Sequence, residues 1–134
     1  MTAVIYWSGT GNTEAMAQAV AEGAGVSAVS VSDFSGNVAD YTSLALGCPA
    51  MGDEILEEDE FEPFFTGIEG SISGKKILLF GSYDWGDGEW MRKWEERVKA
   101  AGAVLLNDAG VIANLAPDDD KLSELRELGR QLAG

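Results

Sequence analysis

The stretch "YWSGTGNTEAM" (residues 6–16) joins an apolar run to a helical pattern through a glycine-rich turn. Residues 3–7 are typical of a buried strand, and from Met16 the apolar residues follow the spacing of an amphipathic helix. A strand, a tight turn and a helix in this order open a parallel α/β unit. Gly9 and Gly11 let the turn expose backbone N–H groups, and the helix start adds its dipole. The stretch therefore predicts a phosphate-binding turn.

The rest of the chain repeats this alternation. Further short apolar runs, each bounded by turn-forming residues, predict strands at 28–31, 44–48, 77–80 and 103–106. The alternating pattern at 27–32 indicates an edge strand. Helical patterns follow at 60–65, 88–102 and 118–132, with a short one at 34–41. We expect one α/β domain over residues 1–134, a three-layer sandwich whose five-stranded parallel sheet has helices on both faces and binds ligands at its carboxyl edge.

Charge and composition exclude several classes of function. Nine basic and 23 acidic residues give a formal net charge of −14, and all the Lys and Arg lie within residues 75–130. Nucleic-acid binding is excluded because it needs clustered cations. No apolar stretch is long enough for a membrane span. Without histidine, the usual triads and metal sites are absent, and the lone Cys48 forms no internal disulfide. We expect a cytoplasmic monomer, with no signal-peptide pattern at the start of the sequence.

The glycine turn is compatible with several phosphate ligands. A P-loop is excluded because its lysine is missing. A dinucleotide fingerprint is closer, with Asp33 after the second strand, but Glu14 stands where a third small residue is needed. The hydroxyls of Ser8, Thr10 and Thr13 favour a terminal phosphomonoester. A glycine turn alone is also compatible with a simple tight connection.

Two further loops follow predicted strands. In "CPAMGDEILEE" (48–58), Gly52 occupies the second place of the turn "MGDE", where type II′ geometry requires positive φ. Only glycine changes turn type at low cost there. In "GSYDWGDGEWM" (81–91), Trp85 either covers a flat ligand or packs down. Trp90 and Trp94 have helical spacing and are assigned to the core, whereas Trp7 and Tyr83 are compatible with packing or with lining a site.

These three loops, in this order and at this spacing, resemble the FMN loops of short-chain flavodoxins, and the likeness covers nearly the whole chain. The resemblance implies a flavodoxin-like sheet of order 2-1-3-4-5 with noncovalently bound FMN. It also implies a low-potential, one-electron carrier of the bacterial cytoplasm, not an enzyme, that shuttles mainly between semiquinone and hydroquinone. The alternative is a small flavoenzyme of the same fold or a reductase-associated flavoprotein. A receiver domain is disfavoured because its aspartates are missing at the strand ends.

The resemblance also assigns cofactor-binding roles by position. The phosphate would be bound by the first loop, namely Ser8, Gly9, Thr10, Gly11, Asn12 and Thr13. The second loop would contribute Pro49, Ala50, Met51, Gly52, Asp53 and Glu54. Of these, Met51 would lie against the inner ring face, the Gly52 carbonyl would turn toward flavin N5–H, and Glu54 would accept from N3–H. The ribityl and pyrimidine side would be lined by Ser82, Tyr83, Asp84 and Gly86, with Asn114 nearby, and Trp85 would stack on the outer face.

Asp84 departs from the family pattern "SYGWG", in which glycine occupies its position. Its side chain would crowd the ring or strain the loop if φ is positive, and its charge would depress the second redox couple. Alternatively, it points to solvent and changes little.

Residues 53–62 form an acidic run in which seven of ten residues are Asp or Glu. Beside the flavin edge, the run would dock basic-patched redox proteins, such as reductases and oxidoreductases that use ferredoxin or flavodoxin. The alternative is that these acids favour the N-terminus of the next helix. No EF-hand spacing is present.

Overall fold

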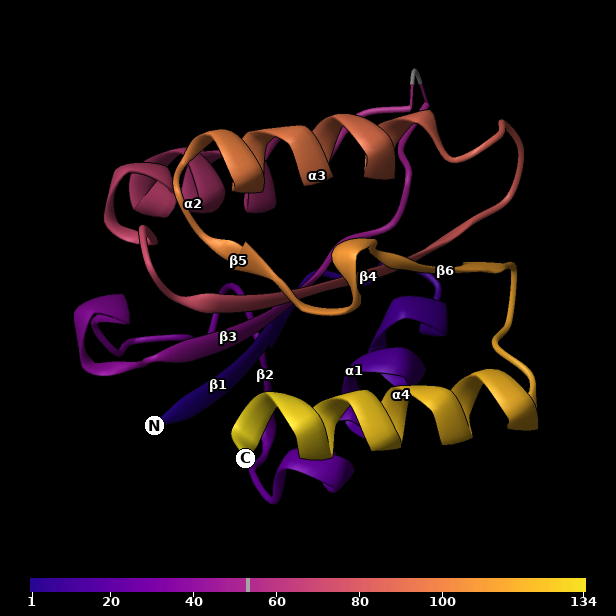
Figure 1. The fold of residues 1–134 in the computed structure, drawn as a ribbon. Helices are drawn as coiled ribbons and strands as arrows, with labels where there is room; N and C mark the ends of the chain where they lie inside the picture. Colours follow the sequence, from indigo (N-terminus) through magenta and orange to yellow (C-terminus); the bar gives the residue numbers. More distant parts are fainter. Residues whose placement is uncertain (53) are drawn as a thin grey trace.

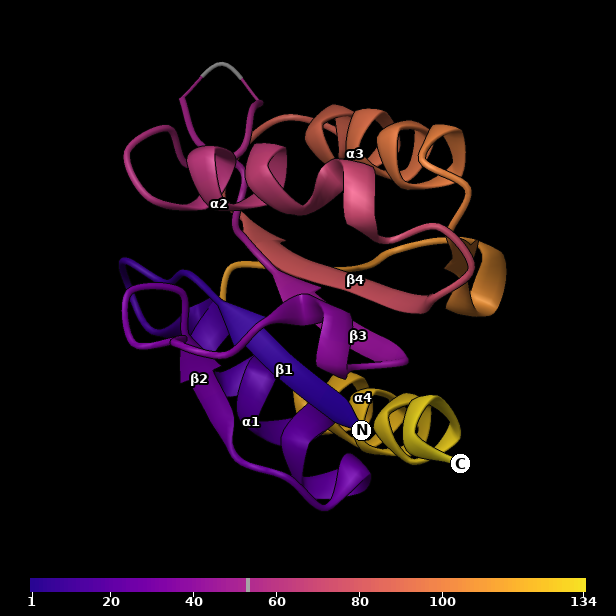
Figure 2. The ribbon, with the colours of Figure 1, turned by 90° about the vertical axis from the view of Figure 1, so that its left-hand side faces the viewer.

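A computed structural model describes residues 1–52 and 54–134 as three layers around a parallel sheet (Figure 1). The strands are β1 (Thr2–Tyr6), β2 (Ala28–Ser30), β3 (Ser43–Gly47), β4 (Lys76–Tyr83), β5 (Val104–Leu105) and β6 (Val111–Asn114). The helices are α1 (Asn12–Ala24), α2 (Phe61–Ile68), α3 (Glu89–Ala100) and α4 (Asp119–Ala133). Figure 2 shows the layers, with α2 and α3 on one face of the sheet and α1 and α4 on the other.

The strand order is β2-β1-β3-β4-β5, and every pair in this sheet is parallel. This confirms the predicted order and the edge position of β2. The chain starts in β1, winds outward to β2, and then crosses back to β3 on the other side of β1. The gap between the loops after β1 and β3 is the topological switch point, where ligands of such sheets bind.

The fifth strand position differs from the expectation of one strand at 103–106. It is divided between β5, which pairs with the start of β4, and β6, which pairs with the end of β4. Between them the chain leaves the sheet in a short 3₁₀ turn, Leu106–Asp108, where Asn107 and Asp108 have positive φ of 66° and 58°. β6 was missed because its apolar run is only three residues long. The division leaves Asn114 at the carboxyl edge beside β4.

Two hydrophobic cores flank the sheet, because successive strand residues point to opposite faces. Val4 packs with the α1–α4 side and the adjacent Ile5 with the α2–α3 side. Trp90 and Trp94 of α3 are buried in the core on the α2–α3 side, at 2% and 1% exposure, as predicted. Cys48 is also buried there, and burial raises the pKa of its thiol. It is therefore a core residue, not a reactive thiol.

Helices α1 and α4 approach each other closely through small residues. A Cβ at Gly129 would overlap the Val20 carbonyl, and one at Gly23 would overlap the Arg126 carbonyl. At its own start, α4 is capped by Asp118, whose Oδ1 accepts from Lys121 N at 2.8 Å, in agreement with the predicted acidic cap. None of the helices described is both long enough and apolar enough to span a membrane.

Candidate functional site

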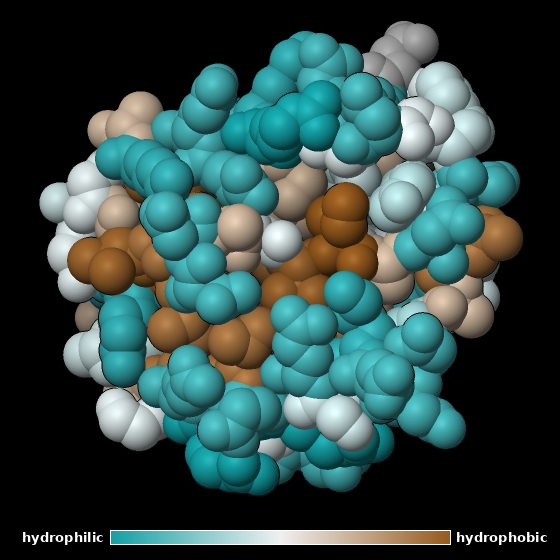
Figure 3. All heavy atoms as spheres, turned by 45° about the vertical axis from the view of Figure 1, so that its right-hand side comes forward, coloured by the Kyte–Doolittle hydropathy of each residue, from teal (hydrophilic) through white to brown (hydrophobic). Residues whose placement is uncertain are grey.

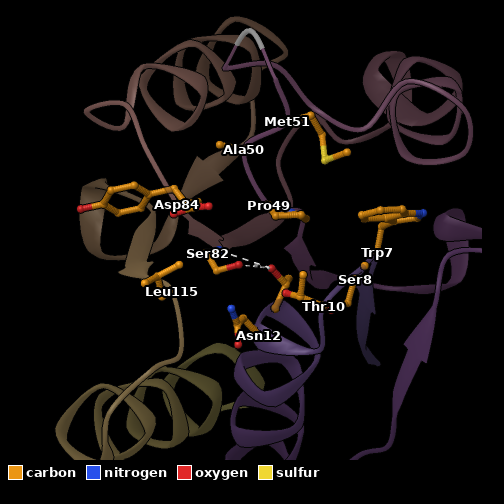
Figure 4. A pocket seen from close by; sticks show the side chains of 13 residues that line it. Trp7, Ser8, Thr10, Asn12, Pro49, Ala50, Met51, Ser82, Asp84 and Leu115 are labelled. Atoms are coloured by element: carbon orange, nitrogen blue, oxygen red, sulfur yellow. Dashed lines mark hydrogen bonds between the residues drawn. The ribbon is translucent and has the colours of Figure 1, made fainter.

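The loops after β1, β3, β4 and β6 enclose a cleft of about 210 Å³ at the carboxyl edge of the sheet. Most predicted site residues line it: Ser8, Gly9, Thr10, Asn12, Thr13, Pro49, Ala50, Met51, Ser82, Tyr83 and Asp84. Trp7 and Leu115 complete the lining, on opposite sides of the cleft (Figure 4). On the face of the molecule seen in Figure 3, hydrophobic side chains lie mainly in hollows bordered by hydrophilic ones.

The first loop offers uncharged hydrogen-bond donors to the cleft. Gly11 takes a φ of 96° and forms the N-cap of α1, and its N–H donates to Ser8 Oγ at 3.1 Å. Among the residues that the structure describes, none caps the first turn of α1 with its side chain. The backbone N–H groups at this helix start are therefore available to an anion. Among the lining residues described there is no Lys or Arg, so an anion would be held by neutral donors and by the helix dipole.

The floor of the cleft is closed by a buried contact between the first and third loops. Thr13 Oγ1 lies 3.0 Å from Ser82 Oγ, and Ser82 N donates to Thr13 Oγ1 at 3.3 Å (dashed in Figure 4). Both residues are buried, at 1% and 5% exposure. The Thr13 hydroxyl is thus engaged with β4, and it fixes the first loop against the sheet.

The second loop forms a tight turn. Met51 N donates to the Ile55 carbonyl at 3.0 Å, and Glu54 N donates to the Met51 carbonyl at 2.7 Å. Gly52 is exposed at the crest, and its φ is not positive, so this turn is not in the type II′ state that the sequence suggested. The left-handed residue is Glu54 instead, with φ 54°. Asp53 lies outside the described residues, and its predicted role stays a prediction.

Trp85 stands on the third loop and is 63% exposed. It does not line the cleft, and neither do Gly11, Gly52, Glu54, Gly86 and Asn114. An exposed indole offers a flat apolar surface on which a ring could stack. Its predicted stacking on the flavin stays a prediction, as do the ligand contacts of the other five residues.

Asp84 lines the cleft, and its φ is not in the positive region. Backbone strain at Asp84 is therefore excluded, whereas crowding of the ring and the effect of its charge stay predictions. The backbone on either side is fixed by Asn114, whose Nδ2 donates to the Tyr83 and Asp84 carbonyls at 3.2 Å each. Leu115 N adds a bond to the Tyr83 carbonyl at 2.7 Å. Asn114 thus supports the third loop from the end of β6.

The acidic run after the turn is largely engaged within the fold. Glu57 is buried at 5% exposure and accepts from the backbone N–H groups of Asp59, Glu60 and Phe61 at 2.8, 2.8 and 2.9 Å. Burial alone would raise the pKa of Glu57, but these three donors outweigh it and hold the pKa below its ordinary value. Glu57 is thus the N-terminal anchor of α2, as one of the two readings of the run expected.

Two other acids of the run have partners from distant elements. Glu62 binds both terminal nitrogens of Arg97 at 2.8 and 2.9 Å, and this bond lowers the pKa of Glu62. Glu60 Oε2 accepts from Trp7 Nε1 at 2.8 Å, which ties the first loop to the run. Glu58 and Asp59 have exposed side chains.

Sequence reasoning missed Leu115, singled out Glu57 only as one acid of the run before the next helix, and left Trp7 compatible with packing or with lining a site. Leu115 follows β6, and the pattern "GVIANL" (110–115) carries the signal of a short strand that could have revealed it. Trp7 follows β1 at the position where ligands of parallel sheets bind. The burial of Glu57 has no sequence signal, because it depends on where the next helix begins.

A glycine-rich turn at the switch point of a parallel sheet, opening on an uncapped helix, defines an α/β protein that binds a phosphorylated ligand. A sequence model described as Flavodoxin matches residues 4–128. The chain is 46% identical over 136 residues to the flavodoxin of Clostridium beijerinckii, with 97% of each chain covered. It is 47% identical over 139 residues to that of Megasphaera elsdenii, covering 99% of this chain and 98% of the other. The chain belongs to the flavodoxin family.

A solved structure gives the same result. The solution structure of two-electron reduced Megasphaera elsdenii flavodoxin has a TM-score of 0.86 at 42% identity, covering 98% of this chain and 99% of that one. Family membership confirms the prediction of an FMN-binding electron carrier. Both relatives described above are flavodoxins, which are electron-transfer proteins and not enzymes.

Proposed function

We propose that the cleft holds FMN with the phosphate on residues 8–13. The observation that carries this proposal is the start of α1, where no described side chain caps the first turn and no described lining residue of the cleft is Lys or Arg. A terminal phosphate satisfies these donors without a lysine or arginine. The hydroxyls of Ser8 and Thr10 and the amide of Asn12 would add side-chain bonds.

The ring would lie between the second and third loops. Met51 lines the cleft from one of them, and the exposed Trp85 stands on the other, which suits two faces of a flat ligand. The Gly52 carbonyl and the Glu54 carboxylate would accept from ring N–H groups. Bound FMN would supply one-electron redox chemistry, and the chain's part is to bind it, orient it and exclude water from one side.

The electrostatics of the site favour a low working potential. No Lys or Arg is among the described residues that line the cleft, whereas Asp84 does line it. Adding negative charge to a ligand in this field is opposed, and partial burial strengthens the opposition because water screens it less. A first electron that arrives with a proton would leave the charge of the ligand unchanged, so the protein would resist a second, unaccompanied electron more than the first.

A reductive titration tests this assignment. Apoprotein is loaded with FMN, reduced stepwise without oxygen, and followed by visible absorbance. Two separate one-electron steps are expected. A single two-electron step, or a protein that binds no FMN, would contradict the proposal.

The redox partners we propose are proteins with basic patches around their own redox centre. Glu58 and Asp59 are exposed on the segment that joins the cleft rim to α2. Free acids at the rim attract basic partners and speed their encounter at low salt. Cytochrome c serves as a basic acceptor protein. Replacing both acids by their amides should slow its reduction and flatten the salt dependence.

Asp40→Asn with Glu96→Gln removes the same charge from exposed sites in other parts of the fold and is the matched control. Equal rates for the two double variants would contradict a local docking patch.

We further propose that the chain acts as a single-domain monomer in the cytoplasm. Sedimentation equilibrium of the holoprotein should give the mass of one chain, and a dimer mass would contradict this.

A further inference from the structure

The carboxylate of Glu54 joins two loops at the rim of the cleft. Its Oε1 accepts from Gly88 N and from Glu89 N, each at 3.1 Å, across more than thirty residues of sequence. Gly88 is the N-cap of α3 and Glu89 its first residue, and the cap residue itself provides no side-chain bond. The start of α3 is therefore capped by an acid from the second loop, where the helix dipole favours negative charge.

The geometry around this contact is specific. A Cβ at Gly86 would lie 2.6 Å from Cδ of Glu54, so any other residue there would push the carboxylate aside. Gly86 and Gly88 both have positive φ, at 97° and 90°. Glu54 has φ 54°, a conformation that non-glycine residues adopt rarely, and it needs support from its surroundings. The contact to α3 provides that support.

The second carboxylate oxygen is not used by this cap. Within the part of the chain that the structure describes, no hydrogen bond joins Oε2 of Glu54 to another residue. One oxygen thus holds α3 while the other is available to an N–H group outside the fold. A carboxylate has lone pairs for both tasks at once.

We propose that Glu54 is a positioning residue that fixes the 51–55 turn and the 84–88 loop as one rim before FMN arrives. The inference rests on the proposed FMN site. Trp85 lies within the loop that Glu54 holds, so the cap also sets where the indole stands. Losing the cap separates the two loops and weakens binding at the ring side, while the phosphate turn at 8–13 keeps its own bonds.

Three substitutions separate the length of the side chain from its charge. Glu54→Gln keeps the length and one oxygen acceptor but removes the charge. Glu54→Asp keeps the charge but is one methylene too short to reach α3 from the same backbone. Glu54→Ala removes both. Glu58→Gln removes one charge from an exposed neighbour and is the matched control.

The first readout uses apoprotein without any ligand. Amide exchange of Gly88 and Glu89, measured by NMR, should be at least about tenfold faster in Glu54→Asp and Glu54→Ala than in wild type, because a lost charged hydrogen bond releases these donors. Glu54→Gln should lie nearer wild type, and Glu58→Gln should match it. Unchanged exchange at these two amides in Glu54→Ala would overturn the proposal.

The second readout compares three ligands. FMN and riboflavin, which lacks the phosphate, should both lose about tenfold in affinity for Glu54→Asp. Inorganic phosphate should bind all variants alike, which a general loss of structure would not allow. Glu54→Gln should restore most of the affinity for FMN and riboflavin. Wild-type affinity in Glu54→Asp, with Glu54→Gln as weak as Glu54→Ala, would show that charge matters and not the cap.

The two proposals fail in different ways. If wild-type apoprotein binds neither FMN nor riboflavin, the proposed function is wrong, and the positioning role falls with it whatever the amide exchange shows. If wild type binds FMN but replacing Glu54 leaves the amide exchange rates of Gly88 and Glu89 unchanged, only the positioning role is wrong.

Discussion

Replacing Glu57 should destabilise the fold far more than replacing the acid beside it. Glu57 is 5% exposed, and its two oxygens accept three backbone N–H groups at the start of α2. In Glu57→Gln the carbonyl oxygen can replace Oε1, but the side-chain amide nitrogen then faces the Asp59 N–H, and one charged bond is lost. We expect the free energy of unfolding to fall by about 3 kcal/mol.

The assay is urea unfolding of the apoprotein, followed by circular dichroism at neutral pH. Glu58→Gln is the control, because its exposed side chain should change the free energy of unfolding by no more than about 0.5 kcal/mol. Equal midpoints for the two variants would refute the view that Glu57 anchors α2.

The same experiment repeated toward acid pH tests the charge on Glu57. The pKa of Glu57 is below its ordinary value of 4.5 in the fold, so the native state holds fewer protons there than the unfolded chain. Stability from this group is therefore complete above the ordinary pKa and is lost as pH falls through the lowered one. The difference between wild type and Glu57→Gln should shrink in acid, and a difference that grows would contradict the assignment.

Three other changes test the fold around the site. Gly129→Ala should lower the free energy of unfolding by about 2 kcal/mol or more, because its Cβ overlaps the Val20 carbonyl. Gly67→Ala, at a helical glycine with open space around it, should raise it by about 0.5–1 kcal/mol. Equal effects of the two variants in urea unfolding would be inconsistent with the close α1–α4 contact. Arg97→Lys loses the planar, two-pronged contact to Glu62 and the contact 4.7 Å above the Phe65 ring. The free energy of unfolding should therefore fall by about 1–2 kcal/mol, and an unchanged urea midpoint would contradict this. Cys48 should react with a thiol reagent only as fast as the protein unfolds, because its thiol is buried with a raised pKa, and rapid labelling of the native protein would oppose its assignment to the core.

The fold was largely predictable because its signals are local. The apolar runs of β1, β3 and β4 and the 3.6-residue spacing of Trp90 and Trp94 each reflect burial of one short segment. β6 was missed because its three apolar residues lie beyond a turn in which Asn107 and Asp108 adopt left-handed conformations. Asn and Asp tolerate this conformation better than other non-glycine residues, but their presence does not indicate that a strand resumes after the turn.

The site was predictable in its loops but less so in its contacts. The glycines of the first turn and the order of the three loops gave most of the residues that line the cleft. The roles of the acids were harder, because Glu54 and Glu57 are chemically alike in sequence. One caps α3 from another loop and the other caps α2 from within its own segment. Only the positions of the helix starts distinguish them.

The central claim is that three loops at one edge of the sheet jointly hold one FMN. Amide-resolved NMR of the apoprotein during an FMN titration tests it directly. The amides of residues 8–13, 50–54 and 82–86 should shift together, at one stoichiometric ligand and with one dissociation constant. Shifts confined to a single loop, or centred away from the cleft, would contradict the account.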